Sequence, residues 1–429
     1  MGLYEVKKEM DRKERALLVA VEIEGSGGWN AEEKAEELTS LALSAGVDVV
    51  ECLACRRKKP SPELFVGSGK AGEIAERIEE READAVIFSE DLTPSQQKNL
   101  EKALGVKVID RTQLILDIFA SRAFSSEGKV QVELAQLEYL LPRLSRMWLH
   151  LGKQAGGIGT KGPGEQQLEV DRRRVRERIA KLKRELKAVK GHRAGNRSKR
   201  DRFSTLTIAM VGYTNSGKST LFNALTGGRV KARNQLFSTL DPTVRKWQLS
   251  NNQTVLLSDT VGFLHDLPHH LIESFKATLE EVVNADLLFH VIDASEKMME
   301  KQIASVNSVL EELGAGDIPV VVVFNKIDKI GAPETTERLK KRCEAPAAAI
   351  SALKRKGLEE IEDIVTRHLQ KDMEDIELEL PHKHYSIARL IREKGALKKE
   401  RYTDKGLFIS ARVPRKIKFQ IFKKLKDNA

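Results

Sequence analysis

The chain has 429 residues, of which 41% are hydrophobic and 32% charged, enough material for two to four packed domains. This composition excludes wholesale disorder, and no apolar run approaches the roughly 18 residues that span a bilayer. The net charge of +10 is concentrated in residues 171–202 and 381–429, each with 15 basic against 4 acidic residues, which leaves −12 for the rest.

Two basic segments on an acidic body indicate a polyanionic partner that is contacted at two places. The alternative is a solvated helix face for the first segment and a frayed tail for the second. The first residues, MGLYEVKKEMDRKER, lack the apolar block of a signal peptide, and three cysteines cannot build a disulfide framework. We therefore expect a cytoplasmic protein with no membrane span.

Residues 15–120 alternate apolar runs with segments of helical periodicity. The runs RALLVAVEI, VDVVECLA, ADAVIFSE and VKVIDR predict buried strands, and helices are predicted over residues 31–45, 72–81, 95–104 and 112–123. This alternation is typical of a parallel sheet with flanking helices. We expect an N-terminal α/β domain over residues 1–120.

The next segment has a heptad rhythm. Apolar residues recur at spacings of four and three in two stretches, the first from Val130 to Leu151 and the second from Val175 to Val189. Between them, GKQAGGIGTKGPG contains six glycines in thirteen residues. The pattern predicts an antiparallel helical hairpin with a glycine-rich tip, in which Pro142 kinks or splits the first helix.

We expect this hairpin to occupy residues 121–203 and to end in a linker, because GHRAGNRSKRD over residues 191–201 has no apolar face. The glycine-rich tip is either a flexible linker or a probe that enters a crowded anionic site. In the second case the candidate RNA contacts are the basic residues of the tip and of the following helix, namely Lys153, Lys161, Arg172, Arg173 and Arg174.

A further α/β domain is predicted over residues 204–370, followed by a small basic α+β domain over residues 371–429. The former contains TLTIAMVGYTNSGKSTLFNAL, where a strand-like run meets the pattern GxxxxGKS and then a helix. Backbone N–H groups of such a loop bind phosphates, the lysine neutralises them, and the serine hydroxyl ligates Mg²⁺. The predicted phosphate loop is Gly212, Tyr213, Thr214, Asn215, Ser216, Gly217, Lys218, Ser219 and Thr220.

Three later strand ends complete a guanine nucleotide site. Asp259 in SDTVGF can hold the metal through a water, and the Gly262 N–H can reach a γ-phosphate. In VVVVFNKID, the Asp328 carboxylate can accept two hydrogen bonds from guanine, which adenine cannot provide. The remaining predicted nucleotide contacts are Asn325, Lys326 along the base, and the backbone N–H groups of Ser351 and Ala352.

The segment NQLFSTLDPTVRK lies between the phosphate loop and Asp259. A nucleotide switch needs a threonine here that ligates Mg²⁺, and we favour Thr239 over Thr243. The predicted catalytic residues are Lys218, Thr239 and Gly262. Phe263 stands where many GTPases place a water-orienting glutamine, so slow intrinsic hydrolysis is expected.

Three weaker patterns receive structural interpretations. Cys52 and Cys55 have redox or zinc spacing but lack enough companions for zinc, so we interpret them as partly buried strand-end cysteines. Residues 67–70, GSGK, are half of a phosphate loop and are interpreted as a turn with a helix start. The histidines at positions 265, 269 and 270 are interpreted as part of a switch segment rather than a metal site.

The chain resembles the HflX family of ribosome-associated GTPases. The resemblance rests on RTQLILDIFASRAFSSEGKVQVELAQLEYLLPRL, on GGIGTKGPGEQQLEVDRRRVRERI, and on FSTLDPT and DTVGF, and it runs nearly the whole length in order. It implies binding to the large ribosomal subunit and its rRNA, and splitting of stalled or idle ribosomes under stress. It also implies ribosome-stimulated hydrolysis, because phenylalanine in place of the glutamine is usual in this family.

The expected protein is thus a GTPase that uses GTP or GDP with Mg²⁺, and we expect it to be a monomer off the ribosome. Two alternatives stay open. One is a large-subunit assembly or anti-association GTPase without active splitting, and the other is an ATP-driven rRNA-remodelling enzyme. Asp328 distinguishes the last of these, because its carboxylate selects guanine.

Overall fold

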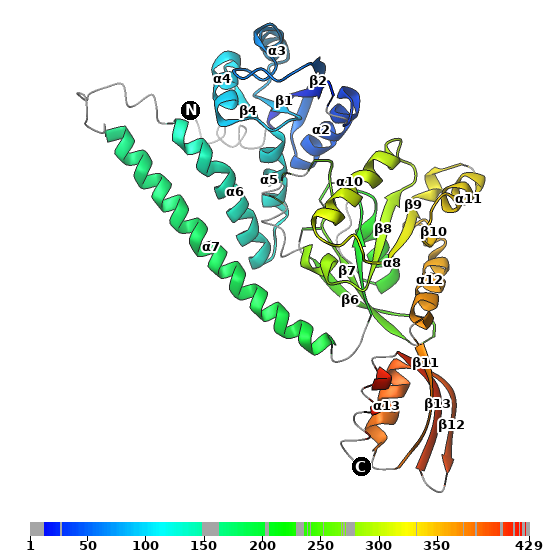
Figure 1. Ribbon diagram of the computed structural model, residues 1–429. Coiled ribbons are helices and arrows are strands. Elements are labelled where there is room, and N and C mark those ends of the chain that lie inside the picture. Colours follow the sequence, from blue (N-terminus) through cyan, green and yellow to red (C-terminus); the bar gives the residue numbers. More distant parts are fainter. Residues whose placement is uncertain are drawn as a thin grey trace, which may run out of the picture. The chain divides into compact units, whose positions relative to one another are not determined.

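Figure 1 shows the protein as a computed structural model. It describes the chain in the following ranges: 13–25, 28–147, 163–201, 206–228, 236–237, 239–240, 242–251, 253–266, 268, 271, 279–331, 333–371, 373–381, 384–403, 406–414, 417–419, 421–422 and 425. Two compact units are present. Unit 1 comprises Met1–Val189, Gln235–Phe237 and Pro268–Phe275, and unit 2 comprises Lys190–Asn234, Ser238–Leu267 and Lys276–Ala429.

Unit 1 contains a parallel four-stranded sheet in the order β2-β1-β3-β4. Its strands are β1 (Arg15–Ile23), β2 (Asp48–Arg57), β3 (Ala85–Phe88) and β4 (Lys107–Ile109). The helices are α2 (Ala31–Ala45), α3 (Ser68–Arg81), α4 (Pro94–Leu104) and α5 (Arg111–Arg122). The α/β fold predicted from the alternating runs is therefore confirmed, and the strands β1 and β3 form its apolar centre.

The helices of unit 1 begin where the sequence supplies caps. Asn30 and Glu33 form a reciprocal capping box at α2, and Thr93 and Gln96 form another at α4. The buried Asp110 caps α5 by accepting a hydrogen bond from the Gln113 backbone N–H. Helix α3 starts four residues earlier than expected, at Ser68.

Helices α6 (Ser126–Met147) and α7 (Pro163–Asp201) run side by side in opposite directions (Figure 1). Their apolar contact is made by the heptad positions Leu134, Leu182 and Leu186, with Val130, Leu137 and Ile179 packed against them. The predicted hairpin is present, and α6 is not split at Pro142. Most of the glycine-rich tip, with Lys153 and Lys161, lies outside the described residues.

The linker predicted for residues 191–201 is wrong, because α7 continues to Asp201. The prediction of a linker rests on the lack of an apolar face in this segment. A helix that is polar all round needs no partner surface, however, and Lys, Arg and Ala are good helix formers. Once the heptad part of α7 is nucleated, each further residue adds a backbone hydrogen bond at small cost.

Unit 2 contains a six-stranded sheet in the order β10-β9-β8-β5-β7-β6, parallel except for the β6–β7 pair. The strands are β5 (Thr207–Val211), β6 (Thr243–Gln248), β7 (Thr254–Asp259), β8 (Leu287–Asp293), β9 (Val320–Asn325) and β10 (Ala347–Ala349). The flanking helices include α8 (Lys218–Thr226), α10 (Met299–Glu312), α11 (Pro333–Lys341) and α12 (Leu358–Lys371), with the short 3-10 turn η1 (Ile327–Lys329) after β9. Since ligands bind beyond the carboxyl ends of parallel strands, the ends of β5, β7, β8 and β9 are where a nucleotide is expected.

The last part of the chain is α+β, as predicted. An antiparallel sheet in the order β11-β13-β12 is built from β11 (Met373–Leu380), β13 (Gly406–Pro414) and β12 (Ala396–Thr403), with α13 (Tyr385–Lys394) packed on it. Inward residues of β13 such as Ile409 and Val413 are fully buried. Over the described part of the chain, no helix is both long and apolar enough to cross a bilayer. The four-domain division stays a prediction.

Candidate nucleotide-binding site

The phosphate loop joins the end of β5 to the start of α8, and two of its glycines have no room for a side chain. Gly212 has φ 148°, and a Cβ there would lie 2.2 Å from the Val291 carbonyl oxygen. Gly217 has φ 95°, and a Cβ there would lie 2.2 Å from the Asn325 amide nitrogen. The loop is therefore packed directly on β8 and β9, which is the close backbone approach that the GxxxxGKS pattern predicts.

The side chain of Lys218 bonds to backbone carbonyl groups of the phosphate loop. It is buried, and Nζ donates hydrogen bonds to the carbonyls of Gly212 at 3.0 Å and of Tyr213 at 2.8 Å. Burial lowers the pKa of Lys218 to about 8, against the opposing attraction of Asp259. A phosphate bound in the loop would place negative charge beside this buried ammonium group and would favour its charged form.

A second segment lies directly against this loop. The Thr214 N–H donates to the Phe263 carbonyl at 2.8 Å, and the Phe263 N–H donates to the Gly212 carbonyl at 3.1 Å. At Gly262 a Cβ would lie 2.7 Å from Thr214 Cα and 3.1 Å from Lys218 Nζ. Gly262 is thus beside the phosphate loop, the position from which its backbone was predicted to reach a γ-phosphate.

The predicted metal ligands converge. The hydroxyls of Ser219 and Thr239 are 2.7 Å apart, and Thr239 Oγ1 donates to Asp259 Oδ2 at 2.9 Å. Asp259 is fully buried, and its other oxygen, Oδ1, has no hydrogen-bond partner among the described residues. Burial raises the pKa of Asp259, although the hydroxyls of Ser219 and Thr239 oppose the shift.

This cluster fits Mg²⁺. Ligands on adjacent corners of an octahedron with bonds of about 2.1 Å are about 3 Å apart, close to the spacing of the two hydroxyls. A cation would also favour the charged form of the buried carboxylate, whose pKa burial raises. The runner-up, Thr243, begins β6 and pairs in register with Asp259 in β7, so the structure brings Thr239 and not Thr243 to Ser219.

The guanine side of the site is assembled across three strands. Asn325 Nδ2 donates to the Ser216 carbonyl at 2.9 Å, and its Oδ1 accepts from the Ala352 N–H at 3.0 Å. Lys326 Nζ donates to the Asn215 carbonyl at 2.8 Å. These bonds tie the end of β9 to the phosphate loop on one side and to the turn after β10 on the other.

Asp328 lies on η1 and accepts a 2.6 Å hydrogen bond from the Ser351 hydroxyl at Oδ1. This bond is the main cause that holds the pKa of Asp328 below its usual value, so the carboxylate is charged at neutral pH. A fixed, ionised carboxylate is the acceptor that the N1–H and amino group of guanine require.

The predicted guanine O6 contacts need a correction. The Ser351 N–H donates to the Lys356 carbonyl and the Ala352 N–H donates to Asn325, so both are used within the protein. Ser351 acts on the site through its hydroxyl instead, because it positions Asp328. The sequence pattern alone could not tell a side-chain role from a backbone role at this turn, and its contact with guanine stays a prediction.

One residue of the site was missed. Asp293, at the end of β8, forms an ion pair with Lys326 at 2.6 Å and accepts bonds from the Ser295 backbone and hydroxyl. It fixes the lysine that was predicted to lie along the base. The sequence does show an acidic residue at the end of the apolar run LLFHVID. Its importance depends on the position of β8 next to β9 in the sheet.

The basic candidates outside this site divide into two groups. Arg173 and Arg174 are exposed on α7 and form long ion pairs of 3.8 Å with Glu177 and Asp171, whereas Arg172 is half-buried. Exposed pairs of this length restrain a side chain weakly, so Arg173 and Arg174 are available to a polyanion. Lys153 and Lys161 lie outside the described residues.

The weaker patterns are placed as follows. Cys52 and Cys55 are half-buried free thiols on β2, and burial raises the pKa of each. Gly67 precedes the first turn of α3, so residues 67–70 form a helix start. Among the described residues no cluster of three or more His, Cys, Asp or Glu side chains could hold a metal, and the histidines 269 and 270 lie outside them.

Family models match three consecutive parts of the chain. They are described as GTP-binding GTPase N-terminal for residues 32–120, GTP-binding GTPase middle region for residues 122–200, and 50S ribosome-binding GTPase for residues 207–326. The GTPase HflX of Caldanaerobacter subterraneus subsp. tengcongensis is 44% identical over 95% of this chain and 92% of its own length. That of Escherichia coli is 43% identical over 89% and 90%.

The chain belongs to the HflX family of GTPases. Among solved structures, a GTP-binding protein from Sulfolobus solfataricus in complex with GDP is 29% identical, covers 83% of this chain and 98% of its own, and has a TM-score of 0.44. Membership in HflX carries GTP binding and hydrolysis, and it explains why the residues of the phosphate loop, the metal cluster and the guanine turn meet at one sheet edge.

Proposed function

We propose that this HflX protein is a GTP-switched factor that binds the large ribosomal subunit and splits stalled or idle ribosomes under stress, with hydrolysis serving release. The observation that carries the proposal is the contact of Thr239 with Ser219 and Asp259, in a chain that also presents the exposed arginines of α7. A threonine at the metal cluster reports the γ-phosphate, and a basic helix binds ribosomal RNA. The match of residues 207–326 to a family described as a 50S ribosome-binding GTPase supports the choice of partner.

The roles of the residues follow from their placement. Lys218 and the N-terminus of α8 hold the β- and γ-phosphates, and Asp328, fixed by Ser351, selects guanine. Ser219, Thr239 and Asp259 would hold Mg²⁺, which neutralises the charge that develops on the transferred phosphoryl group. Loss of the γ-phosphate removes its own contact with Thr239, and the GTP-state arrangement is released.

Phe263 accounts for the expected dependence on the ribosome. Its side chain is buried and its backbone is bonded to the phosphate loop, so no polar group of this residue can orient the attacking water. Hydrolysis by the isolated protein should therefore be slow, and the ribosome should raise it. We expect the protein to act in the cytoplasm and to be a monomer off the ribosome.

Light scattering of intact ribosomes, on addition of the protein with a non-hydrolysable GTP analogue or with GDP, tests the proposal. A fall in scattering with the analogue but not with GDP establishes splitting in the GTP state. No fall, with the protein still sedimenting on large subunits, would favour the assembly or anti-association function. Equal activity with ATP would favour the RNA-remodelling enzyme, against which Asp328 argues.

A further inference from the structure

The side chain of Tyr213 joins the phosphate loop to the segment that follows Gly262. Tyr213 is 6% exposed, and its hydroxyl oxygen accepts a hydrogen bond of 3.0 Å from the His265 backbone N–H. Both residues belong to unit 2. The GxxxxGKS pattern leaves the residue type at this position open, because the loop binds phosphate through its backbone. Phosphate binding by the loop therefore does not account for a tyrosine here.

The hydroxyl bond continues a short backbone pairing between the same two segments. Tyr213 and Phe263 form a parallel β-bridge, in which the Phe263 carbonyl accepts from the Thr214 N–H and the Phe263 N–H donates to the Gly212 carbonyl. The backbone pairing ends at Phe263. The Tyr213 hydroxyl reaches the next inward-facing amide, two residues further along, and so lengthens the stretch that is tied to the loop.

Packing holds the residues between these bonds. Phe263 is 1% exposed and Leu264 is 0% exposed, and a Cβ at Gly262 would lie 2.7 Å from Thr214 Cα. The hydroxyl bond of Tyr213 thus lies in a packed region, where a polar group left without its partner costs more than it would in water. Residues 262–265 are held against the phosphate loop by both bonds and burial.

The character of the chain changes directly after the last of these bonds. Asp266 has φ 43°, in the left-handed region that aspartate adopts more readily than most residues, and its side chain is 77% exposed. The backbone therefore turns at Asp266 and leaves the packed surface. The end of the held stretch coincides with the amide that Tyr213 binds.

We infer that the Tyr213 hydroxyl is a positioning group, which holds residues 262–265 against the phosphate loop whether GTP or GDP is bound. The Gly262 N–H then stays where the γ-phosphate is predicted to bind, and nucleotide-dependent movement of this segment begins at Asp266. The inference rests on the predicted contact of Gly262 and on the proposed GTP switch. A segment that is ordered in advance removes part of the entropy cost that GTP binding would otherwise have to offset.

The first test measures the affinity of the full chain for a non-hydrolysable GTP analogue and for GDP, each with Mg²⁺, by calorimetry. Tyr213→Phe removes the hydroxyl and keeps the ring. It is expected to weaken analogue binding about fivefold, the order that one buried hydrogen bond supplies, and to leave GDP binding unchanged because GDP has no γ-phosphate. Tyr402→Phe, at a tyrosine that is 68% exposed, is the matched control and should bind both nucleotides as the parent does.

Two results would overturn the inference. Unchanged analogue affinity in Tyr213→Phe would mean that the hydroxyl does not serve the γ-phosphate position. An equal loss of analogue and GDP affinity would describe a general defect of the phosphate loop, which is what a purely structural role predicts.

Hydrogen exchange supplies the second test, followed by mass spectrometry on fragments that cover residues 262–265. In the parent these amides should exchange equally slowly with GDP and with the analogue. In Tyr213→Phe exchange should become faster, most of all with GDP, because no γ-phosphate is then present to hold the segment. Rapid exchange in the GDP-bound parent, or unchanged exchange in the variant, would refute the fixed segment.

The ribosome light-scattering assay separates this inference from the proposed function. If Tyr213→Phe shows the selective loss and the faster exchange but the parent does not split ribosomes, the proposed function fails and the positioning role stands. If the parent splits ribosomes and Tyr213→Phe binds both nucleotides as the parent does, the positioning role is refuted and the proposed function stands.

Discussion

Asp328, the proposed acceptor for guanine, is held in place by one hydroxyl, that of Ser351. Replacing the carboxylate by an amide removes the acceptor for one of the two guanine donors and presents a donor in its place. We expect Asp328→Asn to weaken GTP binding by about a hundredfold or more, since a site built to pair a polar group rejects a partner that leaves it unpaired. Competition binding with GTP, ATP and XTP measures this, and unchanged preference for GTP would refute the guanine assignment.

Ser351→Ala is the graded companion to that variant. The carboxylate remains but loses the hydrogen bond that fixes it and holds its pKa down. The loss of GTP affinity should therefore be several-fold, well short of that of Asp328→Asn, with the preference over ATP retained.

His290 makes the nucleotide sheet sensitive to acid. It lies in β8 in register with Val211 of β5, it is 4% exposed, and burial with the nearby charge of Lys218 lowers its pKa to about 4 from 6.5. Between these values the unfolded chain binds a proton that the folded chain does not. Stability conferred by the neutral imidazole is therefore complete above pH 6.5 and is lost as the pH falls toward 4.

The expected contribution is about 3 kcal/mol of unfolding free energy across that window. Urea unfolding at pH 4.5 and 7, followed by Trp247 fluorescence with Trp29 and Trp148 replaced by Phe, measures it, because Trp247 packs in the same core. His290→Gln should have a shallower pH dependence than the parent. Identical slopes would show that other groups control the acid transition.

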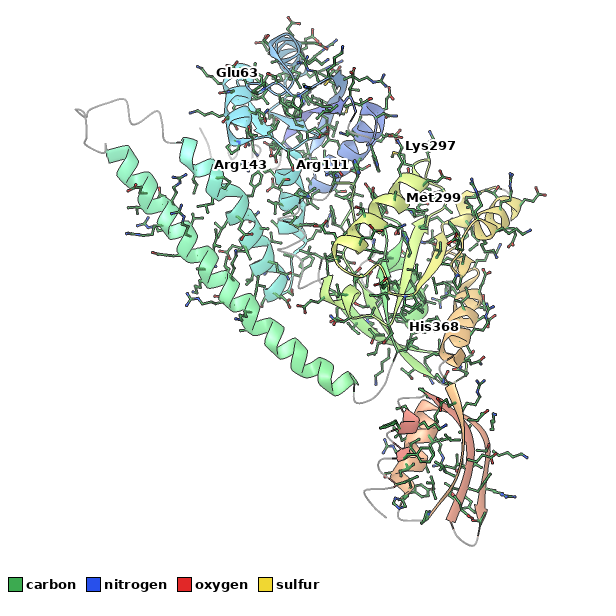
Figure 2. The ribbon with its side chains drawn as sticks, viewed as in Figure 1. Glu63, Arg111, Arg143, Lys297, Met299 and His368 are labelled. Carbon is green, nitrogen blue, oxygen red and sulfur yellow. The ribbon has the colours of Figure 1, made fainter. Side chains whose placement is uncertain are left out.

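Within unit 1, α6 is joined to the N-terminal α/β sheet and its helices through a buried ion pair. Arg143, labelled in Figure 2, lies on α6. It donates to Asp110 at 2.8 Å, to the Leu92 carbonyl at 2.9 Å and to Gln97, and it stacks on the Tyr139 ring. Burial raises the pKa of Asp110, with Arg143 among the groups that oppose the rise. Removing the arginine leaves that carboxylate buried without its cation.

We expect Arg143→Ala to lower the unfolding free energy of unit 1 by about 3 kcal/mol, the usual order for breaking a buried pair. Urea unfolding followed by Trp29 fluorescence is suitable, because Trp29 is a buried residue of unit 1. Arg178→Ala is the control, since Arg178 pairs with Glu133 on the exposed side of the α6–α7 hairpin and should change stability little. Comparable effects of the two variants would argue against the buried pair.

Elements with a strong period or a fixed motif could be predicted from the sequence, because local rules decide them. The strands around RALLVAVEI and TLTIAMV, the GKST helix start and the heptad hairpin are of this kind. What could not be predicted depended on contacts between distant segments. Asp293 matters only because β8 lies beside β9, and the role of Ser351 depends on where its hydroxyl points.

The end of α7 was missed for a different reason. An amphipathic pattern is evidence of a partner surface, and its absence over residues 191–201 predicts a linker. A helix that continues past its partner has no such pattern, and only propensity remains to indicate it.

At the scale of the whole molecule, the separation of basic segments from an acidic body should govern the proposed association with ribosomal RNA. Exposed arginines of α7 release counterions when they meet phosphates, so affinity for large subunits should fall at least about tenfold between 50 and 200 mM salt. Sedimentation with ribosomes across salt concentrations measures the slope. Arg173→Ser with Arg174→Ser should make that slope shallower by about 2, whereas Arg77→Ser on α3 should leave it unchanged. A salt-independent complex would contradict the electrostatic part of the proposal.

The strand order of unit 2 has a consequence for how the protein is made. β5 carries the phosphate loop at the middle of the sheet, but its neighbours β7 and β8 come later in the chain, and the turn that fixes Asp328 follows β10. During synthesis the loop is exposed long before any strand can pair with it, and such distant pairings form slowly. A nucleotide stabilises only what it binds, so GTP should protect the finished chain from proteases while leaving chains that stop before β10 as vulnerable as they are without it.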